Sequence, residues 1–327
     1  MNKIAVIGGS GFVGSHIVAD LIKAGNDVIS CSRNPDKTHP DIWKNADITN
    51  TQSIINACEK CDVIYHLAAL HKDNIKPISL YEDINVNGTK NLCEAADKIG
   101  TKHIIFMSTV AVYGKTDDDE PNEDTTPKPN TPYGKTKLQA EQILKEWQAK
   151  KTDRKLTIIR PPAIFGSSET GTVYSLIKQI EADRFIMIGN GKNKKSLAYL
   201  PNLSEFLVHA LSFKKDINIY NYVDKPDLSM NELVSLIRQE MGKKNTFGAG
   251  IYLPYIAGIS VAIFFDLMSK ILKRKFPISK ILVQKFCRET IFSSQKLDGC
   301  NFTSEYKLEN ALRKTVKATL PHHFHNI

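Results

Sequence analysis

The chain has 327 residues, of which 42% are hydrophobic and 24% are charged, and these proportions are ordinary for a globular enzyme with a large core and two lobes. Its six cysteines are scattered, and only Cys58 and Cys61 form a CxxC. That pair has no partner pair and no suitable histidines, so we expect reduced structural cysteines and no metal site. No signal peptide is expected, because a strand begins at Lys3, and a cytoplasmic location is expected.

The positive charge is concentrated in the second half of the chain. Residues 1–150 carry 17 Lys and Arg against 20 Asp and Glu, whereas residues 151–327 carry 27 against 15. A basic second half suits an anionic substrate, such as a nucleotide diphosphate, or an anionic membrane surface. Nucleic acid is the weaker interpretation, since no nucleic-acid-binding motif is visible.

The first thirty residues predict a strand, a glycine-rich turn, a helix and a second strand. An apolar run at 4–7 is followed at once by glycines and then by apolar residues at helical spacing. A pyrophosphate binds the unpaired amides at the start of a helix, and side chains in the turn would block its approach. The pattern therefore predicts a dinucleotide site made by Gly8, Gly11, Phe12, Val13 and Gly14.

The end of the second strand bears on which dinucleotide is bound. NAD-binding units usually place an acid there to hold the ribose 2′-hydroxyl, but SCSRN contains none. Arg33 can pair with a 2′-phosphate, so NADP is favoured over NAD. The alternative is a solvated arginine beside a permissive site.

Several later segments are expected to complete the cofactor site. Asp47 and Ile48 follow a short segment and would border the adenine. The buried strand at 63–69 ends in small residues that let a cofactor lie close, whereas His66 reads as a packed histidine. The residues expected to contact the cofactor here are Leu67, Ala68 and Ala69.

An apolar strand at 103–107 runs into Ser108 and Thr109, and a helix is predicted to start at Thr131-Pro132. In that helix Tyr133 and Lys137 stand four residues apart, on one face. Such a pair is common by chance, but it gains weight after a Ser-Thr at a strand end in a dinucleotide-binding pattern.

The remaining elements are less regular. A strand at 156–160 stops at Pro161, a basic run contains Lys195, and a late strand is expected at 219–223. Ser229 and Glu232 predict a capping box at the start of the next helix. A closing helix is expected within 302–320.

Residues 247–265 carry no formal charge, and Lys270, Lys273, Arg274 and Lys275 follow them. A buried or subunit-facing helix is the first interpretation, an interfacial helix on an anionic membrane the second, and a membrane span the third.

Four motifs in this order, GGSGFVG, STVAVYG, YGKTK and IIRPPAIFG, make the chain resemble the extended short-chain dehydrogenase/reductases, and more narrowly the nucleotide-sugar epimerase/dehydratase group. The resemblance implies an α/β fold, a Rossmann doubly wound parallel sheet with a smaller C-terminal substrate-binding lobe. The expected division is 1–165 with about 204–224 for the NAD(P)-binding domain, and 166–203 with 225–327 for the nucleotide-sugar lobe. It also implies a homodimer formed by the helices near 80–98 and 132–150.

The resemblance assigns roles by position. Thr109 would orient a sugar hydroxyl, Tyr133 would be the acid/base, and Lys137 would favour the phenolate and hold the nicotinamide ribose. Lys195 would meet the substrate diphosphate as a point charge. Ser108 and Pro161 would complete the cofactor site.

Departures from the group narrow the reaction. Its dehydratases carry an acidic pair after the Ser/Thr, but this chain has Val110 and Ala111 there, so a dehydratase is disfavoured. A 4-epimerase and an NADPH-consuming 4-keto reductase remain, acting at C4 of a nucleotide sugar for surface-polysaccharide synthesis. A hydroxysteroid-type dehydrogenase and a non-catalytic NADP-binding protein are the alternatives.

Overall fold

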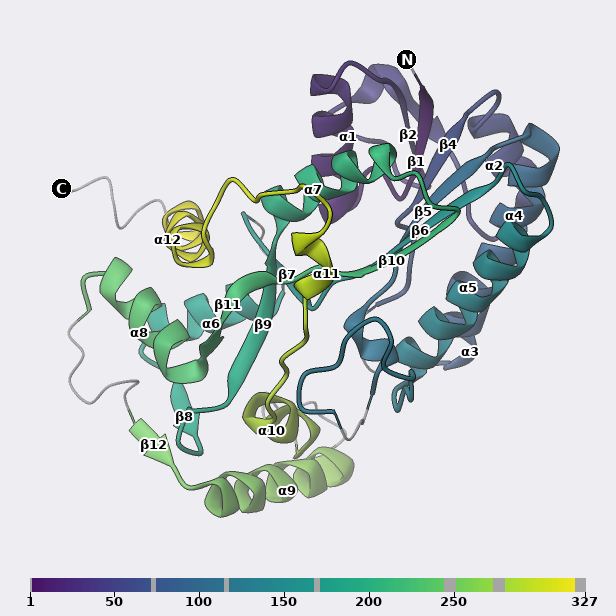
Figure 1. Cartoon of the computed structure of the whole chain (residues 1–327). Coiled ribbons are helices and arrows are strands. Elements are labelled where there is room, and N and C mark those ends of the chain that lie inside the picture. Colours follow the sequence, from purple (N-terminus) through teal and green to yellow (C-terminus); the bar gives the residue numbers. More distant parts are fainter. Residues whose placement is uncertain are drawn as a thin grey trace. The chain divides into compact units, whose positions relative to one another are not determined.

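The computed structural model describes residues 2–71, 75–114, 118–167, 171–243, 251–272 and 280–320 (Figure 1). The chain divides into two compact units. Unit 1 comprises 1–162, 200–223 and 292–305, and unit 2 comprises 163–199, 224–291 and 306–327.

Unit 1 is built on a seven-stranded sheet in which every strand pair is parallel. Its strands, in spatial order, are β10 (Ile217–Asn221), β6 (Lys155–Arg160), β5 (His103–Met107), β4 (Val63–His66), β1 (Lys3–Ile7), β2 (Asp27–Ser32) and β3 (Trp43–Asn45). The central strands β1, β4 and β5 are apolar runs without alternation, because helices cover both of their faces. The predicted doubly wound sheet is confirmed.

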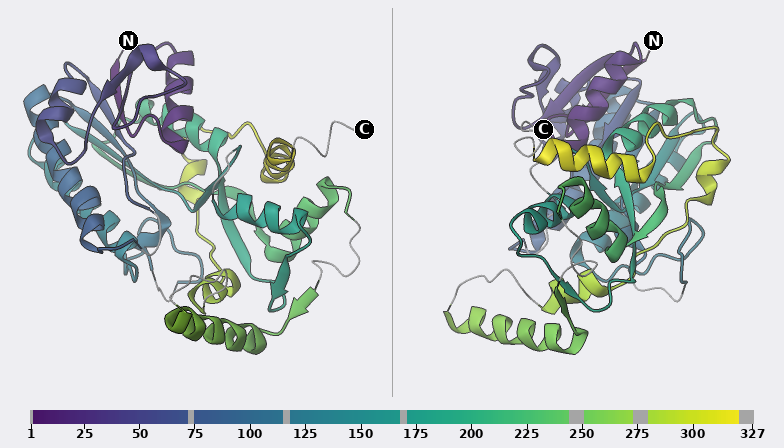
Figure 2. Two further views of the ribbon diagram at one scale, coloured as in Figure 1. Left: turned by 180° about the vertical axis from the view of Figure 1, so that it is seen from behind. Right: turned by 90° about the vertical axis from the view of Figure 1, so that its left-hand side faces the viewer.

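The helices of unit 1 form a layer on each side of this sheet (Figures 1 and 2). One layer contains α1 (Phe12–Lys23) and α7 (Leu200–His209), which pack on each other, and the other contains α2 (Thr51–Ala57), α4 (Gly88–Ile99) and α5 (Pro132–Ala149). The short elements are α3 (Ser79–Tyr81), a π-helical turn (Glu82–Asn87), α11 (Gln295–Asp298) and 3₁₀ turns at Pro40–Ile42, Val110–Val112 and Ala210–Ser212.

The segment 292–305 groups with unit 1, whereas the sequence analysis assigned it to the second lobe. The ring of Phe302 packs against those of Phe206 on α7 and Tyr222 after β10. Aromatic burial of this kind depends on tertiary contacts between distant segments, so no local sequence pattern predicts that 292–305 packs with unit 1.

Unit 2 contains a three-stranded sheet in the order β11 (Asp224–Ser229), β9 (Lys194–Tyr199) and β7 (Ala163–Phe165), and a pair formed by β12 (Ile251–Leu253) and β8 (Ile186–Ile188). Its core lies among α6 (Thr172–Glu181), α8 (Met230–Glu240) and α12 (Leu308–Thr319). The predicted capping box of Ser229 and Glu232 starts α8. The remaining helices are α9 (Tyr255–Leu272) and α10 (Lys280–Cys287).

The apolar segment 247–265 corresponds to β12 and most of α9, while its first residues lie outside the described ranges. The first interpretation is a buried or subunit-facing helix. The helix is not buried within the described chain, since Ile256 is 80% and Phe264 58% exposed, and a subunit-facing helix stays a prediction. Within the described residues, no helix combines the length and apolar character that crossing a bilayer requires.

Candidate active site

The dinucleotide cradle forms where β1 passes through the glycine turn into α1. The helix begins at Phe12 with Gly11 as its N-cap, and no side chain caps the first amides. The first-turn N–H groups of a helix have no intrahelical partner, so those of Phe12, Val13 and Gly14 can receive an anion. The predicted residues of the cradle therefore lie together in the turn and at the start of α1.

Two glycines are required here by their surroundings. Gly8 has a φ of 93°, and a Cβ on it would lie 2.9 Å from the Ala68 backbone nitrogen. A Cβ on Gly14 would lie 2.0 Å from the Gly8 carbonyl oxygen, so only glycine lets α1 pack this closely on the turn. Gly8 thus lets the turn pack closely against the loop after β4. The cradle formed in this way fits a dinucleotide pyrophosphate.

The end of β2 contains an acid that the sequence analysis did not consider. Asp36 is buried, and its carboxylate accepts hydrogen bonds from the Ser30 hydroxyl (2.6 Å) and from the amides of Thr38 and His39 (3.0 and 3.1 Å). Burial raises the pKa of Asp36, but these hydrogen bonds outweigh it and hold the pKa below its usual range. The carboxylate is committed to its own loop, so it is not an outward-facing ribose acceptor.

Arg33 is exposed at the same strand end, and its positive charge contributes to lowering the pKa of Asp47. Burial is the largest single influence on the pKa of Asp47 and raises it, but the hydrogen bonds from the Thr49 amide and hydroxyl, together with Arg33, outweigh burial and lower the pKa. Arg33 and Asp47, predicted to flank the adenosine half of the cofactor, are therefore electrostatic neighbours.

Thr109 and Tyr133 are brought together at the end of β5. Thr109 caps the 3₁₀ turn that follows it, and Thr131 caps α5 with Pro132 in its first turn, as predicted. Burial raises the pKa of Tyr133 to about 12, and a hydrogen bond with the Thr109 side chain opposes that rise. Val110 and Ala111, at the positions of the missing dehydratase acids, form this 3₁₀ turn.

Lys137 lies one turn after Tyr133 but is bound elsewhere. Its ammonium donates to the Met107 carbonyl at 2.6 Å and lies 3.9 Å from the centre of the Phe106 ring. Burial lowers the pKa of Lys137 to about 7, although the Glu141 carboxylate opposes this shift. Burial is the largest influence on the pKa of both groups, and the role of Lys137 in favouring the Tyr133 phenolate stays a prediction.

A buried polar network, which the sequence analysis missed, lies behind this pair. Glu141 is fully buried and accepts hydrogen bonds from the Ser108 hydroxyl at 2.5 Å and from Arg160 Nε and Nη2 at 2.9 and 2.6 Å. Arg160 also donates to the Tyr113 hydroxyl at 2.9 Å, which donates to Asn221 at 2.8 Å. The Ser108 hydroxyl, predicted to contact the cofactor, is engaged in this network.

The π-helical turn before α4 directs a second missed residue inward. Asn85 is buried and exchanges two hydrogen bonds with the backbone of Leu70, at 2.8 and 3.1 Å, and donates a third to Thr136 on α5 at 3.1 Å. It therefore ties the loop that contains Leu67, Ala68 and Ala69 to the helix of Tyr133. π-Helical turns are rare in proteins, but those that occur are frequently found at functional sites. Hydrophobic periodicity in the sequence does not reveal them.

His66 is packed, as the sequence analysis expected. It lies 1% exposed against the Phe106 ring, and burial lowers its pKa to about 3. The Thr89 hydroxyl donates to the Asn85 carbonyl, so His66 Nε2 must be the donor in its 3.0 Å contact with that hydroxyl. With its pKa lowered to about 3, the imidazole is neutral at pH 7.

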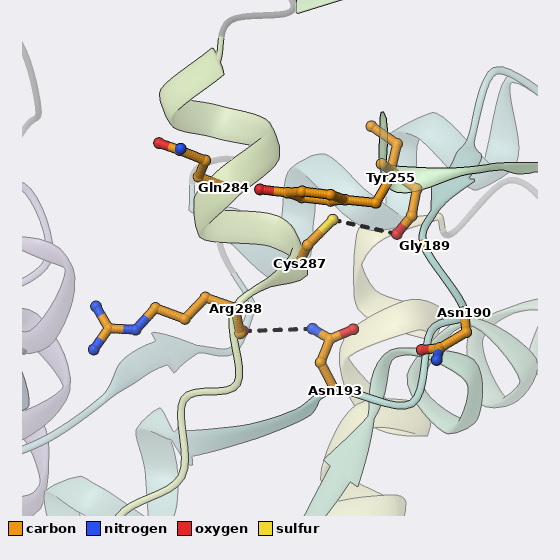
Figure 3. Close-up of a pocket in the computed structure, with 8 residues that line it drawn as sticks. Gly189, Asn190, Asn193, Tyr255, Gln284, Cys287 and Arg288 are labelled. Atoms are coloured by element: carbon orange, nitrogen blue, oxygen red, sulfur yellow. Dashed lines mark hydrogen bonds between the residues drawn. The ribbon is translucent and has the colours of Figure 1, made fainter. Parts of the chain in front are cut away.

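Unit 2 contains Lys195 and a cavity of about 460 Å³ (Figure 3). Lys195 donates to the Arg288 carbonyl, and burial lowers its pKa to about 8. The cavity is lined by residues of β8, the β8–β9 loop, α10 with Arg288 after it, and the start of α9. They are Ile188, Gly189, Asn190, Asn193, Tyr255, Gln284, Cys287 and Arg288.

Residues 4–222 match the NAD dependent epimerase/dehydratase family. The chain is also 40% identical, over 98% of its length and 96% of the relative's, to the N-acetyl-alpha-D-glucosaminyl-diphospho-ditrans,octacis-undecaprenol 4-epimerase of Escherichia coli O157:H7. The chain belongs to this family. A UDP-glucose 4-epimerase of Lactobacillus helveticus is 34% identical over 52% of the chain and 54% of the relative.

Solved structures show the same fold at lower identity. The UDP-glucose 4-epimerase of Thermotoga maritima superposes with a TM-score of 0.78 at 21% identity, and the UDP-N-acetylglucosamine 4-epimerase of Bacillus cereus with 0.76 at 22%. Each match covers 98% of this chain and 99% of the other. The predicted family, its Rossmann fold and an NAD-dependent enzyme are confirmed, whereas the preference for NADP stays a prediction.

Proposed function

We propose that this family member is a 4-epimerase that inverts C4 of an N-acetylhexosamine carried on a polyprenyl diphosphate. The observation that carries the proposal is the end-to-end identity of 40% with an enzyme whose name specifies that substrate. That relative favours the epimerase over the 4-keto reductase. A nucleotide diphosphate is the other carrier the family offers, since several relatives and structural neighbours are named for UDP-sugars.

The chemistry at C4 falls to two side chains of unit 1. Tyr133 would remove the proton of the C4 hydroxyl while hydride leaves C4, giving a 4-keto sugar. Return of the hydride to the opposite face of C4, and of the proton to the C4 oxygen, would complete the inversion. Thr109, hydrogen-bonded to Tyr133, would orient the hydroxyl. When bound, NAD supplies the hydride acceptor and donor.

The cofactor would be held by the predicted residues. The unpaired amides at the start of α1 would bind its pyrophosphate, Arg33, Asp47 and Ile48 would flank the adenosine, and Lys137 would hold the nicotinamide ribose. The remaining proposed contacts are Leu67, Ala68, Ala69, Ser108 and Pro161. On unit 2, Lys195 would meet the substrate diphosphate.

A direct assay separates the two carriers. The purified enzyme is given N-acetylglucosaminyl-diphospho-polyprenol or UDP-N-acetylglucosamine, and the C4 configuration of the released sugar is determined. We expect inversion on the polyprenyl carrier without added cofactor, and a stoichiometric dinucleotide, NAD or NADP, in the denatured protein. Inversion on the UDP-sugar alone would overturn the carrier, and a requirement for added NADPH would overturn the epimerase.

Two proposals about partners accompany this function. A homodimer through the helices near 80–98 and 132–150 follows from the family resemblance and is tested by the mass of the enzyme in solution. Peripheral membrane contact through 247–275 follows from the lipid carrier.

A further inference from the structure

Helix α9 exposes large apolar side chains along one face. The exposed fractions are 80% for Ile256, 48% for Ile263, 58% for Phe264 and 56% for Leu267. These positions follow the spacing i, i+7, i+8 and i+11, which places them on one side of a helix. We call Ile256, Ile263, Phe264 and Leu267 the α9 stripe.

The polar groups beside the stripe are already used. The Ser260 hydroxyl lies on the same face, one turn after Ile256, and donates to the Ile256 carbonyl at 3.0 Å. Asp266 accepts a hydrogen bond from the Lys280 amide at 3.0 Å, which ties α9 to the start of α10. Within the described residues, a partner surface that docks on the stripe therefore contacts apolar side chains.

The opposite face of α9 contains the small residues. A Cβ on Gly258 would lie 2.6 Å from Ile188 Cγ2, so this glycine lets α9 approach β8 closely. Ala262, one turn later, is fully buried. A helix on a globular surface normally points its large apolar residues inward, whereas α9 points large apolar residues outward and small ones inward. The exposed face of α9 therefore suits an apolar environment outside the chain.

The charges that follow the stripe identify that environment. Between 268 and 280 the sequence carries Lys270, Lys273, Arg274, Lys275 and Lys280 and no acidic residue. An apolar helical face followed in the sequence by a run of cations is the pattern of helices that lie on anionic lipid.

We propose that α9 is a membrane-docking surface whose stripe inserts into the headgroup region of an anionic phospholipid membrane. The choice of a membrane over a protein partner rests on the proposed polyprenyl-linked substrate, which resides in a bilayer. Tyr255, the first residue of α9, and Arg288 both line the cavity of unit 2 (Figure 3). The docking surface thus begins at the rim of this cavity.

Vesicle flotation tests the surface without relying on activity. The enzyme is mixed with vesicles of phosphatidylethanolamine and phosphatidylglycerol, or of phosphatidylcholine alone, and the floating fraction is measured. We expect binding to the anionic vesicles, and a loss of at least about tenfold in partitioning for Phe264→Glu/Leu267→Glu. The matched control is Ile22→Glu/Ile217→Glu, which places the same two charges on apolar residues of unit 1 with 41% and 39% exposure and should float like the parent.

Two further measurements keep the proposal falsifiable. The fluorescence of Phe264→Trp should shift to the blue with anionic vesicles, which does not depend on the folding of the double variant. Equal flotation of the parent and the double variant, or a smaller oligomer for the double variant in solution, would overturn the docking surface.

Activity separates this proposal from the proposed function. The double variant should lose turnover of a long-chain substrate in vesicles but keep turnover of a water-soluble short-chain analogue. Flotation of an enzyme that inverts neither polyprenyl substrate would leave the surface standing and overturn the function. Inversion of both substrates by an enzyme that does not float would support the function and overturn the docking surface.

Discussion

Replacing Glu141 by Gln should destabilise the enzyme strongly, although the two side chains have nearly the same size. The carboxylate is fully buried and accepts three hydrogen bonds, two of them from Arg160. Gln cannot neutralise the guanidinium, and Arg160 is itself only 2% exposed. Removing one partner of a buried ion pair costs about 3–5 kcal/mol because the other charge stays buried.

Thermal unfolding measures this cost. A loss of about 3–5 kcal/mol corresponds to a fall in Tm on the order of 10 °C for a domain of this size class. The control is Glu146→Gln, the same change at an exposed position of α5, which should leave the Tm nearly unchanged. The double variant Glu141→Gln/Arg160→Met removes both charges and should be more stable than Glu141→Gln alone.

The reasoning would be refuted by a shift in Glu141→Gln no larger than that in Glu146→Gln. A double variant less stable than the single one would also refute it, because Arg160 would then contribute through contacts other than its ion pair. A merely structural role for Glu141 would leave the pH profile of turnover unchanged in the surviving enzyme. We expect that profile to change, because the Glu141 carboxylate raises the pKa of Lys137.

The other predictions concern the predicted site. Tyr133→Phe should lower kcat by about 10²–10⁴ and leave NAD affinity unchanged, measured by turnover and by equilibrium titration; wild-type turnover would contradict its assigned role. Arg33→Ala should weaken NADPH binding more than NADH binding, and equal losses would remove the reason for preferring NADP. Gly14→Ala should abolish dinucleotide binding, since its Cβ would lie 2.0 Å from the Gly8 carbonyl oxygen, and unchanged titration would contradict this. Burial lowers the pKa of Lys137 from 10.5 to about 7, so the unfolded chain binds more protons between these values and stability should rise with pH across that window. In Lys137→Met, urea unfolding should show this rise reduced.

Local patterns were sufficient for the cradle and for the start of α5. The glycines of the first turn, the Thr131 cap and the Ser229 capping box each depend on neighbours within a few residues, so sequence spacing predicts them. The spacing of Tyr133 and Lys137 likewise placed them on one helix.

What could not be predicted depends on contacts between distant segments. Glu141 reads as one more charged residue of α5, although its position eight residues after Tyr133 and four after Lys137 is a signal that it shares their inward face. Its partner Arg160 lies on a strand, and only the fold brings them together. The π-helical turn of Asn85 and the orientation of Lys137 toward Met107 are likewise invisible to periodicity.

The electrostatics of Tyr133, Lys137 and Glu141 suggest why the carboxylate is buried so close to the catalytic pair. Burial favours the neutral form of both Tyr133 and Lys137, with pKa values of about 12 and 7. A positive charge such as an oxidised nicotinamide favours the phenolate, but it also disfavours the ammonium of Lys137. Glu141 acts in the opposite sense on Lys137, and Arg160 and Ser108 fix its position. The network therefore limits how far burial lowers the pKa of Lys137, which an amide at position 141 could not do.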